Sequence, residues 1–194
     1  MITALLKNRI RGFERHYGYD AGYLADTVGA DAHGGLKLML ASTFLAHRFA
    51  APTEAYFAAK VRSAMRADCG PCLELTVKMA EEAGIVPADL LPVLGHGDAR
   101  GDIALAIRFA DAVIDNAEEL VEIVDETRRR FGERAMPGLA AAVVAGQFYP
   151  LYKRGMGHAA TCRPVVRDLI ARHGGTNGRR VDADADHRIA AGLS

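Results

Sequence analysis

Residues 67–84 read ADCGPCLELTVKMAEEAG, and this stretch places a helix start directly at a Cys-Gly-Pro-Cys segment. Gly70 is expected to be the N-cap and Pro71 the first helical residue, because proline has no N–H to lose at that position. The apolar spacing predicts a helix from Pro71 to Glu82 that stops at Gly84. This helix and its two cysteines organise the interpretation of the rest of the chain.

Cys69 and Cys72 are the expected chemical centre. At i and i+3 their α-carbons lie near enough to close a disulfide, which needs roughly 4.4–6.8 Å. Cys72 is expected in the first turn, where free backbone N–H groups and the helix dipole lower the pKa of a thiol. Cys69 is expected just outside the helix, placed to attack a sulfenate or mixed disulfide on Cys72. The basic residues Lys60, Arg62 and Arg66 on the preceding helix are candidates to assist.

Three other interpretations of the pair were weighed. Inert buried thiols are one, and metal binding is another, although no second ligand pair at zinc spacing exists in the sequence. Cys-Gly-Pro-Cys is also the thioredoxin active-site string, but thioredoxins place it after a β-strand. Residues 58–67 are predicted to be helical and the chain has no Trp, which excludes a thioredoxin fold. The third cysteine, Cys162, stands alone.

The chain is predicted to be all-α. Apolar residues recur at helical spacing, as in Ile103, Ile107, Ala110 and Ile114, and no run shows β-alternation. A compact bundle of about seven or eight helices is expected. The expected helices cover residues 3–17, 35–49, 53–67, 71–82, 87–94, 99–116, 117–131 and 133–149, with a short one around 23–28.

Length and composition indicate one globular domain. The chain has 194 residues, of which half are hydrophobic and a quarter charged. Residues 1–173 are expected to form a single helical domain with a CxxC core at 52–152. Residues 174–194 are expected to be a flexible tail.

Charge and hydropathy exclude several classes of function. The 24 basic and 24 acidic residues cancel, so the totals give no electrostatic support for nucleic-acid binding. Residues 1–9 become charged before a signal peptide can form, and the weakly polar stretch 136–150 is too short to span a membrane. We therefore expect a cytoplasmic protein that binds neither nucleic acid nor membrane.

The segment 68–85, followed by Leu90-Leu91 and a helix over 102–116, resembles the carboxymuconolactone decarboxylase and alkylhydroperoxidase D-like superfamily. The resemblance is clearest over 54–116 and extends to about 152. It implies an all-helical fold that assembles into dimers, trimers or hexamers. In the peroxidase branch it implies antioxidant reduction of small hydroperoxides, without metal or organic cofactor, with a redox-active disulfide regenerated by an external dithiol or reducing protein.

The resemblance also implies roles for individual residues. The second cysteine of the peroxidase branch is peroxidatic and the first resolves it, which corresponds to Cys72 and Cys69. That branch carries a His four residues after the second cysteine and a Glu twelve residues before the first. Here these positions are Thr76 and Phe57, so the family's proton relay is not reproduced.

Three residues are candidates to support the cysteines. The hydroxyl of Thr76, one turn after Cys72, is placed either to bond a thiolate or to bond its own backbone. Glu54 is a candidate to replace the missing carboxylate, or else stabilises the first turn of its own helix. His158 would supply a base, and Cys162 a third thiol, if the segment after 149 folds over the CxxC.

The sequence thus predicts a thiol oxidoreductase in which Cys72 attacks a peroxide or disulfide and Cys69 resolves the product. The competing hypothesis is a non-catalytic helical oligomer, or small-molecule-binding protein, with structural cysteines. A decarboxylase-type lyase is a third possibility, but the chemistry of that branch does not rest on a CxxC.

Overall fold

The computed structural model describes residues 2–158, and these residues are all-helical. They form nine α-helices and one 3-10 helix, and no strand occurs among them, which confirms the all-α class with slightly more helices than expected. Cys162 and the expected tail at 174–194 lie outside the described residues. The helices are α1 (Ile2–Tyr17), α2 (Gly22–Ala30), α3 (Ala32–Leu45), α4 (Thr53–Arg66), α5 (Gly70–Glu82), α6 (Pro87–Val93), α7 (Gly101–Asp115), α8 (Leu120–Phe131), η1 (Glu133–Ala135) and α9 (Met136–Gly155).

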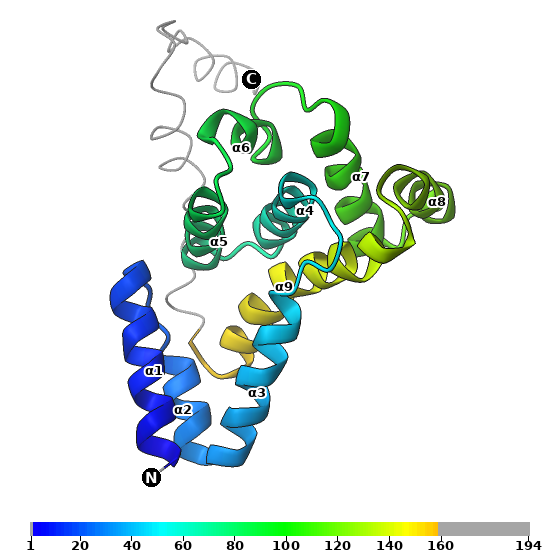
Figure 1. Cartoon of the computed structure of the whole chain (residues 1–194). Helices are drawn as coiled ribbons and strands as arrows, with labels where there is room; N and C mark the ends of the chain where they lie inside the picture. The colour runs from blue at the N-terminus through cyan, green and yellow to red at the C-terminus, as the bar shows by residue number, and fades with distance from the viewer. Residues whose placement is uncertain (1, 159–194) are drawn as a thin grey trace, which may run out of the picture.

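Helix α4 lies at the centre, with α5, α6, α7 and α9 around it (Figure 1). Its residues are buried on almost every side, as expected for a helix inside a core. It packs most extensively on α9, where Gly146 allows close approach: a Cβ there would lie 2.5 Å from the Cβ of Ser63. The Ser63 hydroxyl donates to the carbonyl of Val143 at 2.6 Å, and Gln147 donates to the Ser63 carbonyl at 2.8 Å.

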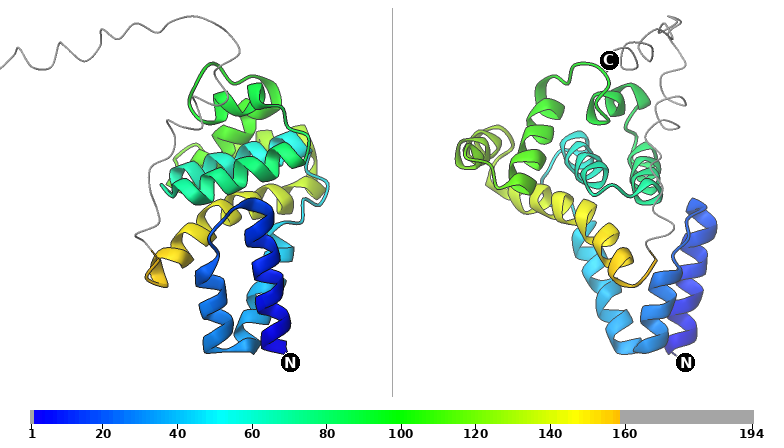
Figure 2. Two further views of the ribbon diagram at one scale, coloured as in Figure 1. Left: turned by 90° about the vertical axis from the view of Figure 1, so that its left-hand side faces the viewer. Right: turned by 180° about the vertical axis from the view of Figure 1, so that it is seen from behind.

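Helices α1, α2 and α3 form a separate group beside this assembly, and the C-terminal end of α9 reaches them (Figure 2). Asp31 begins α3 by accepting hydrogen bonds from the backbone N–H groups of His33 and Gly34. Glu82 at the end of α5 accepts from Tyr17 at 2.6 Å and contacts His16 at 2.7 Å. These contacts tie α1 to α5, the helix that carries the cysteines.

The buried apolar residues fall into two clusters. The main core lies between α4, α5, α6, α7, α8 and α9 and contains residues such as Val61, Phe109 and Leu139. The second cluster, here called the thiol-side cluster, joins α1 and α2 to the start of α5. Its members are Leu6, Ile10, Tyr19, Ala21, Tyr23, Val28, Cys69 and Cys72.

Several predicted helix boundaries were wrong. Helix α3 begins at Ala32 because Asp31 caps it, and it ends at Leu45 rather than residue 49. Helix α5 begins at Gly70, and its N-cap is Cys69 rather than Gly70. Helix α9 continues through Pro150 to Gly155, because burial of Pro150 against neighbouring helices offsets the hydrogen bond that proline removes.

Candidate functional site

The turn between α4 and α5 sets the direction of both cysteines. Asp68 adopts a left-handed conformation with φ 50°, which a short polar side chain tolerates better than most. Cys69 follows as an extended N-cap, and its carbonyl accepts the first helical hydrogen bond from the N–H of Leu73 at 2.9 Å. Cys72 therefore lies in the first turn of α5, as predicted.

The two cysteines are buried and adjacent. Their sulfur atoms lie 2.9 Å apart, and the residues are 2% and 4% exposed. Cys72 lines a cavity of about 390 Å³, whereas Cys69 is not part of the cavity wall. A molecule in the cavity therefore meets Cys72, with Cys69 behind it.

The cavity lies where the N-terminal helices meet α4, α5 and α9. Most of its lining is apolar, with Leu38, Met39 and Leu75 among the contributors. Its volume falls within the range of small-molecule sites, roughly 300–1,000 Å³. An apolar space beside a thiol suits an organic ligand better than a bare ion.

Tyr19 contacts the sulfur of Cys72, and Tyr23 and Lys153 pack against Tyr19. The hydroxyl of Tyr19 lies 3.4 Å from the Cys72 sulfur and 3.5 Å from the hydroxyl of Tyr23. The ammonium of Lys153 lies 5.0 Å from the ring centre of Tyr19 and 5.8 Å from that of Tyr23. Lys153 is 0% exposed, and its amine has no hydrogen-bond partner among the described residues. This arrangement places a buried lysine over the ring of the tyrosine that contacts the thiol.

Burial keeps these tyrosines protonated. Desolvation, followed by the neighbouring Tyr23 and Cys72, raises the pKa of Tyr19 far above its usual range. Desolvation is also the main reason that the pKa values of Tyr23 and Tyr149 are raised. At neutral pH Tyr19 thus keeps its hydroxyl proton, and either its hydroxyl or the Cys72 thiol can be the donor between them.

Thr76 and Phe57 occupy the positions of the family's proton relay, but they do not supply a proton relay. The hydroxyl of Thr76 lines the cavity but donates to the carbonyl of Cys72 at 2.8 Å, which is the backbone role considered as the alternative. Phe57 packs in the main core. Glu54 is exposed in the first turn of α4 and is not part of the cavity wall, so its role as a substitute carboxylate stays a prediction.

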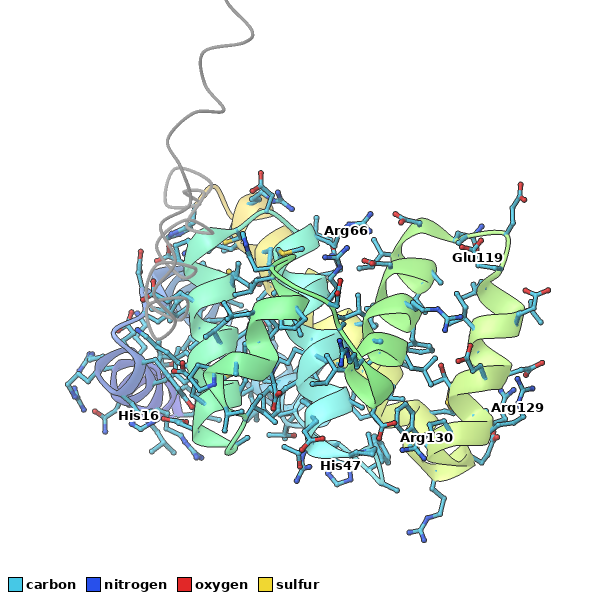
Figure 3. All side chains as sticks on the ribbon, turned by 90° about the horizontal axis from the view of Figure 1, so that it is seen from above. His16, His47, Arg66, Glu119, Arg129 and Arg130 are labelled. Atoms are coloured by element: carbon cyan, nitrogen blue, oxygen red, sulfur yellow. The ribbon has the colours of Figure 1, made fainter. Side chains whose placement is uncertain are left out.

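His158 and two of the three basic candidates have other neighbours. His158 lies 2.9 Å from the Asp26 carboxylate, and its ring packs at an angle on Tyr23. Arg62 and Arg66 bind Asp111, and Arg66 also binds Asp115, so both point from α4 toward α7. Arg66 is labelled in Figure 3. Lys60, by contrast, lines the cavity.

Within residues 2–158 no group of three or more metal-ligating side chains is assembled. In the same range no helix combines the length and the hydrophobicity needed to cross a bilayer.

Sequence reasoning missed Tyr19, Tyr23 and Lys153. Tyr19 precedes the short helix predicted around 23–28, Tyr23 begins it, and Lys153 follows Pro150, beyond the predicted end of the last helix. The pattern Tyr19, Tyr23 and Val28 at near-helical spacing was the available signal, but it shows a buried face and not what that face covers.

Comparison with known proteins returned no match: no protein-family model, no curated protein and no solved structure is similar to this chain. The superfamily resemblance therefore stays a prediction from the residues quoted for it.

Proposed function

We propose that this chain is a thiol-dependent oxidoreductase that reduces a hydroperoxide or a disulfide through Cys72 and Cys69. One observation carries the proposal: Cys72 lines an apolar cavity while the sulfur of Cys69 lies 2.9 Å from its own. A substrate in the cavity contacts Cys72 first, and Cys69 lies close enough to attack the product that forms on the Cys72 sulfur. Attack by Cys72 and resolution by Cys69 follow from that order.

With a hydroperoxide, the Cys72 thiolate attacks the outer oxygen. A sulfur–oxygen bond forms as the oxygen–oxygen bond breaks, and the alkoxide takes up the proton that Cys72 released and leaves as an alcohol. Cys72 is then a sulfenic acid, and Cys69 attacks its sulfur, releases water and forms the disulfide. The two electrons come from the dithiol. An external dithiol or reducing protein restores them by thiol–disulfide exchange.

Lys153 and Tyr19 support the thiolate in this proposal. A cation in a low-dielectric site favours a neighbouring anion, and a hydroxyl that donates to a thiolate favours the charged form. Lys153 lies over the tyrosine rings and Tyr19 lies 3.4 Å from the sulfur. These groups would do part of the work that a His and a Glu do in the peroxidase branch.

We further propose an alkylhydroperoxidase D-like arrangement, assembled as a homo-oligomer in the cytoplasm. The all-helical architecture and the CxxC at a helix start support the first part. Large apolar side chains left exposed on α3 and α9 support the second. These include Leu40, Phe44, Val144 and Leu151.

The second candidate is a non-catalytic small-molecule-binding protein. The cavity favours it, because an apolar space of about 390 Å³ holds a ligand whether or not the thiols react. The two candidates differ in what happens to Cys72 when an oxidant is added. No observation in the described residues favours the lyase alternative.

The deciding experiment follows thiols during a single turnover with cumene hydroperoxide. It uses a Cys162→Ser background, so that only the CxxC pair can react. The background protein should lose both thiols per hydroperoxide and recover them with dithiothreitol. Adding Cys69→Ser should stop the reaction at a sulfenic acid on Cys72 that dimedone traps, and adding Cys72→Ser should abolish it. Equal, negligible rates in all three proteins would establish the non-catalytic candidate instead.

A further inference from the structure

Lys60 is a cation that the proposed thiol chemistry does not use. It reaches the cavity from α4, and its ammonium lies 3.8 Å from the sulfur of Met79 and 5.7 Å from the ring centre of Tyr56. A thioether is a weak acceptor, so three ammonium donors have one poor partner among the described residues. The next basic residues on α4, Arg62 and Arg66, are both bound to carboxylates of α7.

Desolvation of the Lys60 ammonium is unfavourable. Desolvation lowers the pKa of Lys60 to about 8, which shows that the cavity wall disfavours the charge without a counter-ion. Besides Lys60, the cavity wall contains one other cation, Arg9, which is exposed on α1. No Asp or Glu belongs to the wall in the part of the chain that the structure describes. The cavity therefore lacks the anion that its buried cation calls for.

The position of Lys60 relative to Cys72 defines a ligand length. Cys72, Thr76 and Met79 line the cavity from successive turns of one face of α5. Met79 follows Cys72 by seven residues, so it lies roughly 10 Å further along the helix at 1.5 Å per residue. Since the Lys60 ammonium contacts Met79, the amine and the thiol lie at opposite ends of the same wall.

We propose that the cavity binds an apolar carboxylate, with the carboxylate at Lys60 and the apolar chain extending along α5 toward Cys72. The ligand is thus an anionic amphiphile of roughly 10 Å, and its far end reaches the sulfur. As the identity of a substrate this rests on the proposed function: the group reduced at Cys72 would be a hydroperoxide or disulfide at the far end of such an acid. The binding itself does not depend on redox chemistry.

Octanoate is the probe, with octan-1-ol and octylammonium as matched molecules of the same chain length. Calorimetric titration of the full chain carrying Cys72→Ser measures binding without thiol reaction. Octanoate should bind at least about tenfold more tightly than octan-1-ol, because its carboxylate adds a desolvated ion pair with Lys60. Octylammonium should bind more weakly than octan-1-ol, because its charge is repelled by Lys60. Equal affinities for the three probes, or preference for octylammonium, would overturn the proposal without any change to Lys60.

Two variants then locate the carboxylate. Lys60→Met keeps the length of the side chain and should weaken octanoate binding about tenfold while leaving octan-1-ol unchanged. Arg9→Met should change octanoate affinity less than about twofold, because an exposed cation is screened. Loss of binding with Arg9→Met but not with Lys60→Met would show that the anion lies at the cavity mouth and that the assignment to Lys60 is wrong.

A last measurement relates the ligand to the thiol. In the Cys69→Ser Cys162→Ser protein, octanoate should slow the alkylation of Cys72 by iodoacetamide with the same concentration dependence as the calorimetric titration. Binding without protection would contradict the orientation along α5. If octanoate binds and protects but no hydroperoxide oxidises the pair, the ligand class stands and the oxidoreductase proposal fails, so the two outcomes remain separate.

Discussion

The main core and the thiol-side cluster are both buried, but they consist of different kinds of side chain. The main core consists of aliphatic and aromatic side chains, and its buried hydroxyls on Ser63 and Thr127 both donate to backbone carbonyls. The thiol-side cluster contains two tyrosines and two thiols, with a cavity beside them. The ammonium of Lys153 lies above the tyrosine rings and has no hydrogen-bond partner within residues 2–158.

The difference indicates that the main core and the thiol-side cluster have different roles. A core with its polar groups satisfied stabilises the fold, since each burial adds favourable transfer free energy. A cluster with a cavity and an unpartnered cation lacks part of that stabilisation, and proteins keep such features where they bind or react. Substitutions in the two regions should therefore affect different measurements, stability in the main core and thiol reactivity in the thiol-side cluster.

The largest expected effect is on the main core. Leu139 of α9 is 0% exposed, and Leu139→Ala should reduce the free energy of unfolding by about 2–5 kcal/mol, because it leaves a cavity in close-packed surroundings. Val121→Ala on α8 is the control, since Val121 is exposed and its substitution should cost less than about 0.5 kcal/mol. Urea unfolding measures both. A changed rate of Cys72 alkylation in folded Leu139→Ala would break the separation between the two regions.

The second effect is expected at Lys153. Lys153→Met removes a positive charge near Cys72, so the midpoint of the pH dependence of Cys72 alkylation should move up by about one pH unit. The free energy of unfolding should stay the same or rise, because an unpartnered ammonium no longer has to be buried. The measurement uses the Cys69→Ser Cys162→Ser background.

Arg154→Met, which removes the exposed cation next in sequence, is the control for Lys153→Met. It should leave the alkylation midpoint in place. An equal shift in the two variants would indicate a general effect of net charge and remove the specific role of Lys153.

The smallest effect concerns the contact that holds α1 against α5. The hydrogen bond from Tyr17, and after it that from His16, lowers the pKa of Glu82 below its usual 4.5. A lowered folded-state pKa stabilises the protein above the unfolded value, and this contribution is lost as pH falls through the folded value. Glu82→Gln should therefore reduce the change of the free energy of unfolding with pH between the folded-state and unfolded-state pKa values of Glu82.

Urea unfolding at several pH values between neutral and acidic conditions measures this change. Glu118→Gln, in the connection between α7 and α8, is the matched control and should keep the wild-type curve. If Glu82→Gln keeps the wild-type acid dependence, the Glu82 contacts do not contribute to holding α1 in place.

Most of the helices could be predicted because their signals are local. The segment 53–66 has an N-terminal Pro-Thr-Glu sequence and helical apolar spacing, and α4 has nearly the predicted bounds. The prediction failed at α9, where Pro150 was read as an end. A proline costs a helix one hydrogen bond, but packing of the distant N-terminal helices on that turn determines whether the helix continues.

The candidate site shows the same limit. The first-turn position of Cys72 follows from the residues directly beside it, and the structure confirms it. Thr76 was also correctly placed on the face of Cys72, but its hydroxyl had two possible acceptors, and only the coordinates show the bond to the Cys72 carbonyl. Glu54 lies in the first turn of α4 and outside the cavity wall, which its distance in sequence from Cys69 could not specify, because that distance does not say which side of a helix faces the site.

By itself, the sequence determined that this protein is helical and that Cys69 and Cys72 lie together at the start of α5, because helix periodicity, proline and capping act within a few residues. The tertiary structure alone decided what surrounds the sulfur of Cys72. Tyr19 lies 53 residues earlier in the chain, and Lys153 is on the last described helix. Contacts over such separations depend on how whole helices pack, since the chain between them sets no distance.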